Sequence, residues 1–378
     1  MLALSQSRPM GRSKKQGETY LNYTVPKEYG DSNGFQAGST FKAFVLAAAI
    51  RDGVGLSTSI DAPSPMTFPG SAYKNCPGAG NFVDPWEVGN STTSGRMTLY
   101  TGTRLSVNTF YAQLEQVTGV CEPFNLAKSM GLFLTKPKIE RLPAFTLGVV
   151  DVSPLEMAGA YATFGARGLY CTPRPVTEIA DSAGNPIKSY DTDCKQVLPK
   201  DVADGVNDVL RGVQEPGGFG HDIGHTNLQT SGGQTIESAG KTGTTQGGKS
   251  VWFMGYTPQI ATAAMIAGAN SFGSPIPLGG QTISGTYISS SAVSGSGFAG
   301  PMWADAMHPI QSELKPVDFE APPASMVAAT PDKVKDIEYT KRPEPEKEKK
   351  KKGKRGRDGS GPGRVAADAD CCAAMALP

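Results

Sequence analysis

The spacing of apolar positions predicts several helices in this chain. Thr40–Arg51 is almost wholly apolar and rich in Ala, and a helix that is apolar on every side must be buried centrally. Asn108–Val117 carries its apolar residues at helical spacing. Ser153–Phe164 opens with Ser-Pro-Leu-Glu, which is typical of a capping box with proline in the first turn. A closing helix is predicted over Ala299–Gln311.

The second half of the chain contains stretches with the composition of β-strands. These strands are expected at Glu237–Thr244, Ser250–Thr257 and Ile260–Ala267. Only a few residues join each strand to the next, and short connections imply antiparallel pairing. The predicted fold class is therefore α+β, an antiparallel β-sheet flanked by helices, with an all-helical subdomain inserted between Arg51 and Val213.

The composition changes after about Leu314, where Pro, Glu and Lys become dominant. Lys341–Arg357 holds ten Lys and Arg against three Glu. Such a segment cannot offset its chain entropy by burial, so we predict a globular domain over residues 1–313 and a disordered tail over residues 314–378. A basic run can contact nucleic acid or an anionic membrane, or simply stay solvated. We favour the solvated tail and expect no nucleic-acid partner.

Two further sequence features restrict the interpretation. The longest apolar run, Ala43–Ile50, is far shorter than the ~20 residues that cross a bilayer, and Met1–Ser5 is too short for the apolar core of a signal peptide. No cysteines have metal-ligand spacing, and the chain has only 3 His. We therefore expect no metal site.

Four of the six cysteines form two candidate disulfides. Cys171 and Cys194 flank a segment with turn signals, as two strands of a hairpin would, and Cys76–Cys121 is the second candidate pair. Each bond would contribute roughly 3 kcal/mol in an oxidising compartment. Reduced, buried thiols are the alternative for both pairs.

Three short blocks carry the candidate chemistry of the chain: Ser39-Thr40-Phe41-Lys42, Ser106-Val107-Asn108 and Lys241-Thr242-Gly243-Thr244. Ser39 and Lys42 are one helical turn apart and so share a face. A serine hydroxyl becomes a good nucleophile only when a base takes its proton. Burial within an apolar helix would lower the pKa of Lys42 enough for it to be that base.

The other two blocks supply the remaining groups of an acyl-transfer site. Ser106 can relay a proton between Lys42 and a leaving amine, and Asn108 can hold a substrate amide; alone, this block would be no more than a helix cap. Lys241 can bind a substrate carboxylate. Thr242, Gly243 and Thr244 are assigned to substrate binding, with Gly243 allowing a ligand close to the strand backbone. The N–H groups of Ser39 and Thr244 would form an oxyanion hole.

The order S-x-x-K, S-x-N, K-T-G resembles that of penicillin-binding proteins and serine β-lactamases. Further similarity to the transpeptidase domain of bifunctional, class A penicillin-binding proteins lies in Gly34–Lys42, Val152–Phe164, Ala239–Thr245 and Val251–Pro258. The resemblance covers about residues 1–312. The high Gly content and the cysteine-containing insertions resemble actinobacterial, Streptomyces-like members.

The resemblance implies a D,D-transpeptidase of peptidoglycan. Ser39 would attack the penultimate D-Ala carbonyl of a stem peptide, and the acyl group would pass to the amine of a neighbouring stem peptide. β-Lactams would acylate the same serine, and no cofactor is expected. The cell-wall synthesis machinery would be the partner, at the extracytoplasmic face of the bacterial cell membrane.

Three alternatives fit the same blocks: a D,D-carboxypeptidase, a β-lactamase-like hydrolase, and a β-lactam-binding fragment without enzymatic activity. A class A β-lactamase needs a glutamate above the acyl ester. Glu156 is a candidate for that role, but its place in a capping box explains it without catalysis.

The resemblance also implies that part of the family's domain is missing. The family sheet has five strands, and Met1–Ser7 aligns with only the end of the N-terminal hairpin. The membrane helix and the glycosyltransferase domain of class A members are expected to be absent from this chain. We therefore predict that the strand at Ile260–Ile266 loses a neighbour, exposes an apolar edge, and leaves the domain with low stability.

Overall fold

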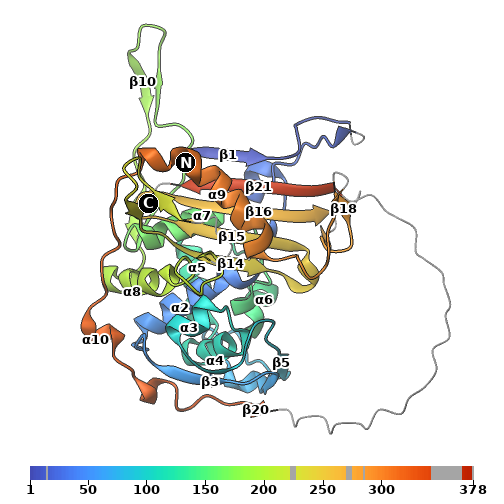
Figure 1. Ribbon diagram of the computed structural model, residues 1–378, viewed down its shortest axis with the longest axis vertical. Helices are drawn as coiled ribbons and strands as arrows, with labels where there is room; N and C mark the ends of the chain where they lie inside the picture. Colours follow the sequence, from blue (N-terminus) through green and yellow to red (C-terminus); the bar gives the residue numbers. More distant parts are fainter. Residues whose placement is uncertain (14–15, 222–226, 270–274, 284–285, 342–367, 377–378) are drawn as a thin grey trace, which may run out of the picture.

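The computed structural model describes residues 1–13, 16–221, 227–269, 275–283, 286–341 and 368–376. Its centre is an antiparallel sheet with the strand order β1-β21-β16-β15-β14 (Figure 1). The strands of this sheet are β1 (Ala3–Gln6), β21 (Asp368–Ala376), β16 (Ala261–Ala269), β15 (Ser250–Tyr256) and β14 (Ala239–Thr244), and β17 (Pro275–Ile276) pairs with the end of β16.

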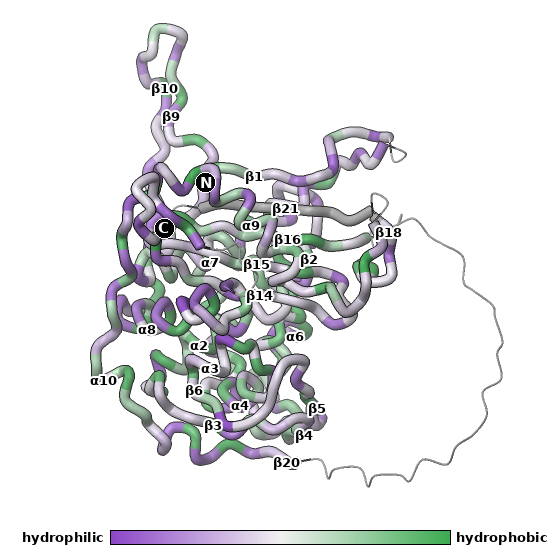
Figure 2. Tube along the Cα trace, in the orientation of Figure 1, coloured by the Kyte–Doolittle hydropathy of each residue, from purple (hydrophilic) through white to green (hydrophobic). Residues whose placement is uncertain are grey.

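Strand β15 is buried along its whole length because helices cover both faces of the sheet. Trp252 and Met254 pack into a core shared with α2 (Lys42–Arg51) and α7 (Pro154–Gly165). Val251 and Phe253 point the other way, into a second core with α9 (Gly300–Met307). The alternation of these four residues therefore fixes which face of the sheet each helix covers. Hydrophobic stretches occur both in this sheet and in the inserted subdomain around α3 (Leu99–Arg104), α4 (Asn108–Thr118) and α6 (Pro137–Glu140) (Figure 2).

Helix α2 is the central helix of the molecule, as its apolar sequence predicts, and every residue from Lys42 to Ile50 is buried. It is surrounded by α4 (Asn108–Thr118), α5 (Cys121–Ser129) and α8 (Lys200–Arg211). The inserted subdomain also holds short antiparallel ladders. They join β3 (Ser59–Ala62) to β6 (Gly95–Thr98) and β4 (Met66–Phe68) to β5 (Trp86–Val88). The expectation of an all-helical subdomain is therefore wrong for residues 59–98.

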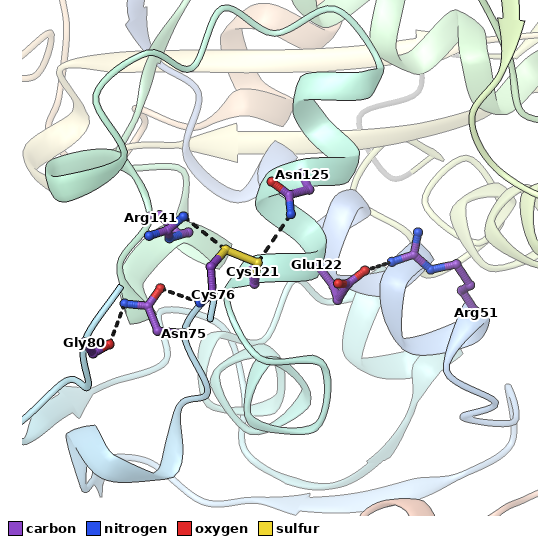
Figure 3. Close-up of a disulfide and its surroundings, with 8 residues drawn as sticks. All are labelled: Arg51, Asn75, Cys76, Gly80, Cys121, Glu122, Asn125 and Arg141. Carbon is purple, nitrogen blue, oxygen red and sulfur yellow. Dashed lines mark hydrogen bonds and ion pairs between the residues drawn. A yellow bond between two sulfur atoms is a disulfide. The ribbon is translucent and has the colours of Figure 1, made fainter. Parts of the chain in front are cut away.

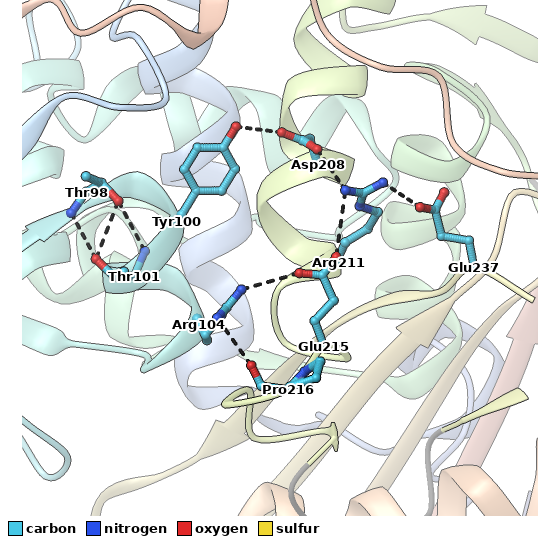
Figure 4. A network of polar contacts seen from close by, with 9 residues as sticks. All are labelled: Thr98, Tyr100, Thr101, Arg104, Asp208, Arg211, Glu215, Pro216 and Glu237. Carbon is cyan, nitrogen blue, oxygen red and sulfur yellow. Dashed lines mark hydrogen bonds and ion pairs between the residues drawn. The ribbon is translucent and has the colours of Figure 1, made fainter. Parts of the chain in front are cut away.

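A polar network joins this subdomain to the edge of the sheet (Figure 4). Arg211, at the end of α8, forms ion pairs with Asp208, Glu215 and Glu237. Arg104, at the end of α3 (Leu99–Arg104), pairs with the same Glu215 at 3.3 Å. These half-exposed pairs align α3, α8 and the chain just before β14.

Both candidate cysteine pairs are bonded in the structure. Cys76 and Cys121 tie the loop after β4 to the start of α5, where Asn125 and Arg141 contact the two sulfur atoms (Figure 3). Cys171 and Cys194 face each other across β8 (Leu169–Cys171) and β11 (Cys194–Gln196). The second bond closes the base of a hairpin, β9 (Glu178–Ala180) and β10 (Pro186–Ser189), that projects from the body (Figure 1).

The C-terminal segment was predicted to be disordered, and this is wrong for residues 315–341. They cross the inserted subdomain as a strap that includes α10 (Ala324–Val327) and β20 (Thr340–Lys341) (Figure 1). Phe319 packs its ring on Tyr256 at 5.5 Å, and β20 pairs with β4. Backbone hydrogen bonds from residues 56 and 57 to residues 326 and 327 hold the middle of the strap. Most of the basic run, residues 342–357, lies outside the described residues.

The predicted exposed edge of β16 is also absent. Strand β21 pairs with β16 along nine residues and with β1 on its other side. Ala264 lies opposite Ala373, and Ser5 lies opposite the same residue from the other neighbour. A segment from the C-terminal part of the chain therefore fills the place in the sheet where we expected a missing strand. In the part of the chain that the structure describes, no helix is both long and apolar enough to span a bilayer.

Candidate active site

Ser39 lies where the chain enters the buried helix α2. It belongs to a 3₁₀ turn, Gly38–Phe41, that continues directly into the α-helix at Lys42, so the predicted nucleophile precedes the first α-helical residue. Gly38 has a positive φ of 60°, and a Cβ at this position would lie 2.9 Å from the backbone N of Thr244. Only glycine allows the turn this close to β14. The first and third sequence blocks therefore meet at this point.

The amino group of Lys42 is completely buried and surrounded by oxygen atoms. Its Nζ lies 2.7 Å from Ser106 O, 2.8 Å from Asn108 Oδ1, 2.9 Å from Ser39 Oγ and 3.2 Å from Ser106 Oγ. Burial lowers the pKa of Lys42 well below its ordinary value, and the nearby Lys241 lowers it further. The spacing of Ser39 and Lys42 predicted this pairing, and the structure brings the two groups into hydrogen-bond contact.

The neighbours of Lys42 define what a neutral amine can do here. Ser106 O and Asn108 Oδ1 are amide oxygens, which only accept hydrogen bonds. A neutral amine has two N–H groups, and these two oxygens use both. Its lone pair is then left for the Ser39 hydroxyl, which is the geometry of a general base beside its nucleophile.

Ser106 connects the two lysines. Its Oγ accepts a hydrogen bond from Lys241 Nζ at 2.7 Å and lies 3.2 Å from Lys42 Nζ. The residue has a φ of 52°, in the left-handed region that is unfavourable for a non-glycine residue. This conformation presents both the carbonyl and the hydroxyl of Ser106 to Lys42.

Lys241 is completely buried on β14 and donates to Ser106 Oγ and to Thr242 O. Burial lowers its pKa to about 7. The structure therefore places Lys241 within hydrogen-bond distance of Ser106, the predicted relay, and on the same strand as the predicted substrate-binding residues Thr242 and Thr244.

Gly243 packs closely against the Ser39 turn. A Cβ at this position would lie 2.3 Å from Ala37 O, so the contact between β14 and the turn requires glycine here. The assignment of Gly243 to substrate binding stays a prediction. Thr242 and Thr244 do line the cavity beside Ser39. The hydroxyl of Thr244 accepts a hydrogen bond from Gly295 N at 3.0 Å, which ties the strand to the opposite wall.

An open cavity of about 380 Å³ leads to these groups. The predicted residues on its wall are Ser39, Ser106, Asn108, Thr242 and Thr244, and sequence reasoning missed Ser91, Thr92, Phe219, Ser291, Val293, Ser294, Gly295 and Ser296. The missed residues come from Gly- and Ser-rich loops, whose composition indicates only irregular structure. None of the described lining residues carries a carboxylate.

Glu156 lies outside this cavity. Its carboxylate accepts hydrogen bonds from the backbone N and the Oγ of Ser153 and from Phe133 N. The bond from Ser153 N, together with the reciprocal bond from Glu156 N to Ser153 Oγ, forms the capping box of α7, as the sequence predicted. Among the described residues, no cluster of His, Cys, Asp and Glu is placed to hold a metal ion.

Comparison with known proteins agrees with this geometry. Residues 3–277 match the family model of the penicillin-binding protein transpeptidase domain. The chain belongs to this family. The match includes all three sequence blocks and the sheet strands β1 and β14 to β17, but neither the strap nor β21.

Relatives of this transpeptidase family member include penicillin-binding protein 1A of Mycobacterium tuberculosis, which is 30% identical over 76% of this chain and 34% of its own length. The Aquifex aeolicus protein of the same name is 30% identical over 77% of this chain and 35% of its own length. The chain thus spans about a third of the length of these curated relatives. The mycobacterial relative is in line with the actinobacterial resemblance.

Solved structures of the family share the fold. PonA1 from Mycobacterium tuberculosis aligns with a TM-score of 0.61 and 28% identity, covering 79% of this chain and 74% of that one. Penicillin-binding protein 1A from Haemophilus influenzae aligns with a TM-score of 0.57 at 22% identity, covering 76% of this chain and 44% of that one. The prediction of an α+β fold with an antiparallel sheet is confirmed by these structures.

Proposed function

We propose that this chain is a serine D,D-transpeptidase that cross-links peptidoglycan stem peptides through an acyl-enzyme on Ser39. The observation that carries the proposal is the surroundings of Lys42, where two amide oxygens take both N–H groups of a neutral amine. A lysine held in this way can remove the proton of Ser39. The solved complex of PonA1 with penicillin V supports β-lactams as ligands of this site.

The acylation step follows from the placement of the groups. Ser39 Oγ attacks the carbonyl carbon of the penultimate D-Ala while Lys42 takes its proton. The resulting oxyanion would be stabilised by the N–H groups of Ser39 and Thr244. When the C–N bond breaks, the proton passes from Lys42 through the hydroxyl of Ser106 to the departing amine of D-Ala. Lys42 is then neutral again.

Cross-linking reverses the direction of the proton. The amine of a second stem peptide attacks the ester carbonyl of the acyl-enzyme and loses a proton through Ser106 to Lys42. Collapse of the intermediate forms the new amide and returns the proton to Ser39 Oγ. Lys241, which donates to Ser106 Oγ at 2.7 Å, would orient this relay and attract the carboxylate of the donor peptide together with Thr242 and Thr244.

Two features favour transpeptidation over β-lactam hydrolysis. Glu156 is engaged at the start of α7, and the described cavity wall has no carboxylate that could activate water. The acyl-enzyme would therefore persist until an amine arrives.

The two disulfides favour an oxidising location, in line with the extracytoplasmic face of the membrane. The cell-wall synthesis machinery remains the expected partner.

Labelling with a fluorescent penicillin tests the proposal. We expect one covalent adduct by intact mass, lost in Ser39→Ala and retained in Ser182→Ala, which changes an exposed serine at the tip of the projecting hairpin. Slow release of the adduct supports a transpeptidase, and rapid turnover would indicate a β-lactamase. An adduct that survives in Ser39→Ala, or no adduct at all, would reject the proposed nucleophile.

A donor peptide ending in D-Ala-D-Ala separates the two remaining enzymatic activities. With an amine acceptor present, a transpeptidase forms a cross-linked amide and releases D-Ala. If D-Ala is released at the same rate and no amide forms, the chain is a D,D-carboxypeptidase.

A further inference from the structure

The segment after β5 lies directly against the second sequence block. Strand β5 ends at Val88, and the chain then passes Gly89 and Asn90 before Ser91 and Thr92 reach the cavity wall. This stretch, residues 89–92, contains none of the residues that the sequence motifs single out. It nevertheless contacts Asn108, the residue that faces Lys42.

Gly89 fixes the orientation of the Asn108 side chain. Asn108 Nδ2 donates to Gly89 O at 2.9 Å, and a backbone carbonyl can only accept. The amide nitrogen must therefore face Gly89, which leaves Oδ1 to face Lys42 Nζ at 2.8 Å. With the amide turned over, an NH₂ group would face the amine and one acceptor of Lys42 would be lost.

Asn90 holds Gly89 in place through its backbone N–H and both ends of its side-chain amide. Its backbone N donates to Ser64 Oγ at 2.8 Å, and its Oδ1 accepts from Thr109 N at 2.8 Å. Its Nδ2 donates to Thr93 O at 2.8 Å and to Thr109 Oγ1 at 2.9 Å. Two of these bonds end on Thr109, the residue next to Asn108, so Asn90 fixes both ends of the contact between Gly89 and Asn108.

We propose that Asn90 is a positioning residue for acylation, acting through Gly89 and Asn108 to keep the lone pair of Lys42 directed at Ser39. The inference rests on the proposed function of Ser39 and Lys42. It adds a residue from an irregular loop to the catalytic arrangement, and that residue touches neither substrate nor nucleophile. The simpler alternative is that Asn90 only secures a surface loop.

The two alternatives differ in what Lys42 experiences. In the described structure, the ionisable groups around its amine are Lys241 from β14 and Tyr111 from α4, whose ring lies 5.5 Å from Lys42 Nζ. Neither touches Asn90. If Asn90 positions Asn108, its loss frees the amide, admits water and changes the titration of Lys42. If Asn90 is only structural, its loss changes stability and leaves that titration alone.

The test compares Asn90→Ala with wild type by two readouts. Titration of Lys42 is followed by NMR of protein labelled with ¹³Cε-lysine, with the signal assigned through Lys42→Met. We expect the Lys42 titration and the acidic limb of the penicillin acylation profile to move together, upwards by about one pH unit. The acylation rate at neutral pH should fall about tenfold.

Two further variants keep the test decisive. Thr109→Val removes one partner of Asn90 at nearly constant volume and should shift both readouts in the same direction by less; it decides the matter if Asn90→Ala does not fold. Asn75→Ala is the matched control, because Asn75 clamps another loop through Gly80 O and Cys76 N (Figure 3). In Asn75→Ala, Lys42 should titrate as it does in the wild type.

The inference is overturned if a folded Asn90→Ala, or Thr109→Val in its place, leaves the Lys42 titration unchanged, or if Asn75→Ala shifts it equally. The NMR titration of Lys42 that decides these outcomes is measured without penicillin. An adduct that persists in Ser39→Ala would instead reject the proposed function, so the two failures are distinguishable.

Discussion

The two sides of the central sheet are built in different ways. On one side, β14, β15 and β16 follow each other through short turns, and β14 meets the Ser39 turn through contacts that only Gly38 and Gly243 allow. On the other side, β16 pairs with β21, whose first residue follows the end of β16 by 99 positions, and then β21 pairs with β1. The candidate chemistry lies entirely on the first side. We call β14, β15 and β16 with the Ser39 turn the local side of the sheet, and β21 with β1 the distant side. We infer that the local side determines reactivity and that the distant side mainly determines stability.

The largest effect is expected from Lys42→Met, on the local side. Removing the base should slow acylation by penicillin at least ~10²-fold, since a positioned base contributes that much or more. The fold should survive, because the change removes a buried amine and keeps an apolar chain of similar length. Rapid acylation kinetics and a thermal melt measure the two effects. Lys188→Met, on the exposed β10, is the control. A rate within twofold of wild type would contradict the assignment of Lys42.

Removing β21 should have the opposite effects: a lower thermal stability and a nearly unchanged acylation rate. A chain that stops before Asp368 leaves β16 and β1 without their shared neighbour, and we expect Tm to fall by more than about 5 °C. Acylation measured well below Tm should stay within about threefold of wild type, because the Ser39 side of the sheet is untouched. A chain that stops after Ala376 keeps the strand and serves as the control. Unchanged Tm would show that β21 is dispensable, and a large loss of acylation would show that the two sides are coupled.

The smallest effect concerns the pH dependence of stability. Lys241 has a pKa of about 7 in the folded chain and close to 10.5 when unfolded. Between these values the unfolded state binds more protons, so the stability that depends on Lys241 rises with pH and is lost as pH falls towards 7. The free energy of unfolding of wild type, minus that of Lys241→Met, should therefore increase by roughly 2 kcal/mol from pH 7 to pH 9. Urea unfolding at both pH values measures it, and a constant difference would show that Lys241 titrates normally.

The local side is also the part that the sequence predicts well. Ser39 and Lys42 are three residues apart on one helix, so their contact follows from helical geometry alone. The Ser153–Glu156 capping box is equally local, and the structure contains it. Strands β15 and β16 are joined by a short turn between Tyr256 and Ala261, and their antiparallel pairing follows from it. In each case the interacting groups are close in sequence, and a small set of backbone geometries decides the outcome.

The distant contacts follow no such rule. The composition of residues 314–378, taken as a whole, indicates disorder, because the segment has many Pro, Glu and Lys and few large apolar residues. Phe319 on Tyr256, further apolar side chains packed against the core, backbone pairing and the hydrogen bonds of Thr330 nevertheless hold the strap in place. The cavity residues Ser91 and Ser294 were missed for a related reason. Loop residues acquire a function from the elements that support them, and those elements lie far away in the sequence.

The position of β21 also has a consequence for the time course of folding. Its ladder joins Ala3 to Met375, a sequence separation of 372 residues, whereas β15 and β16 meet across a tight turn. Loop-closure entropy grows only logarithmically, so doubling the connecting chain would cost about 0.6 kcal/mol in stability. Contacts of such separation nevertheless form slowly, because most of the chain must be ordered before they are favourable. The sheet should therefore close from β14 towards β1, and the β16 edge should be the last surface that a newly made chain leaves open to aggregation.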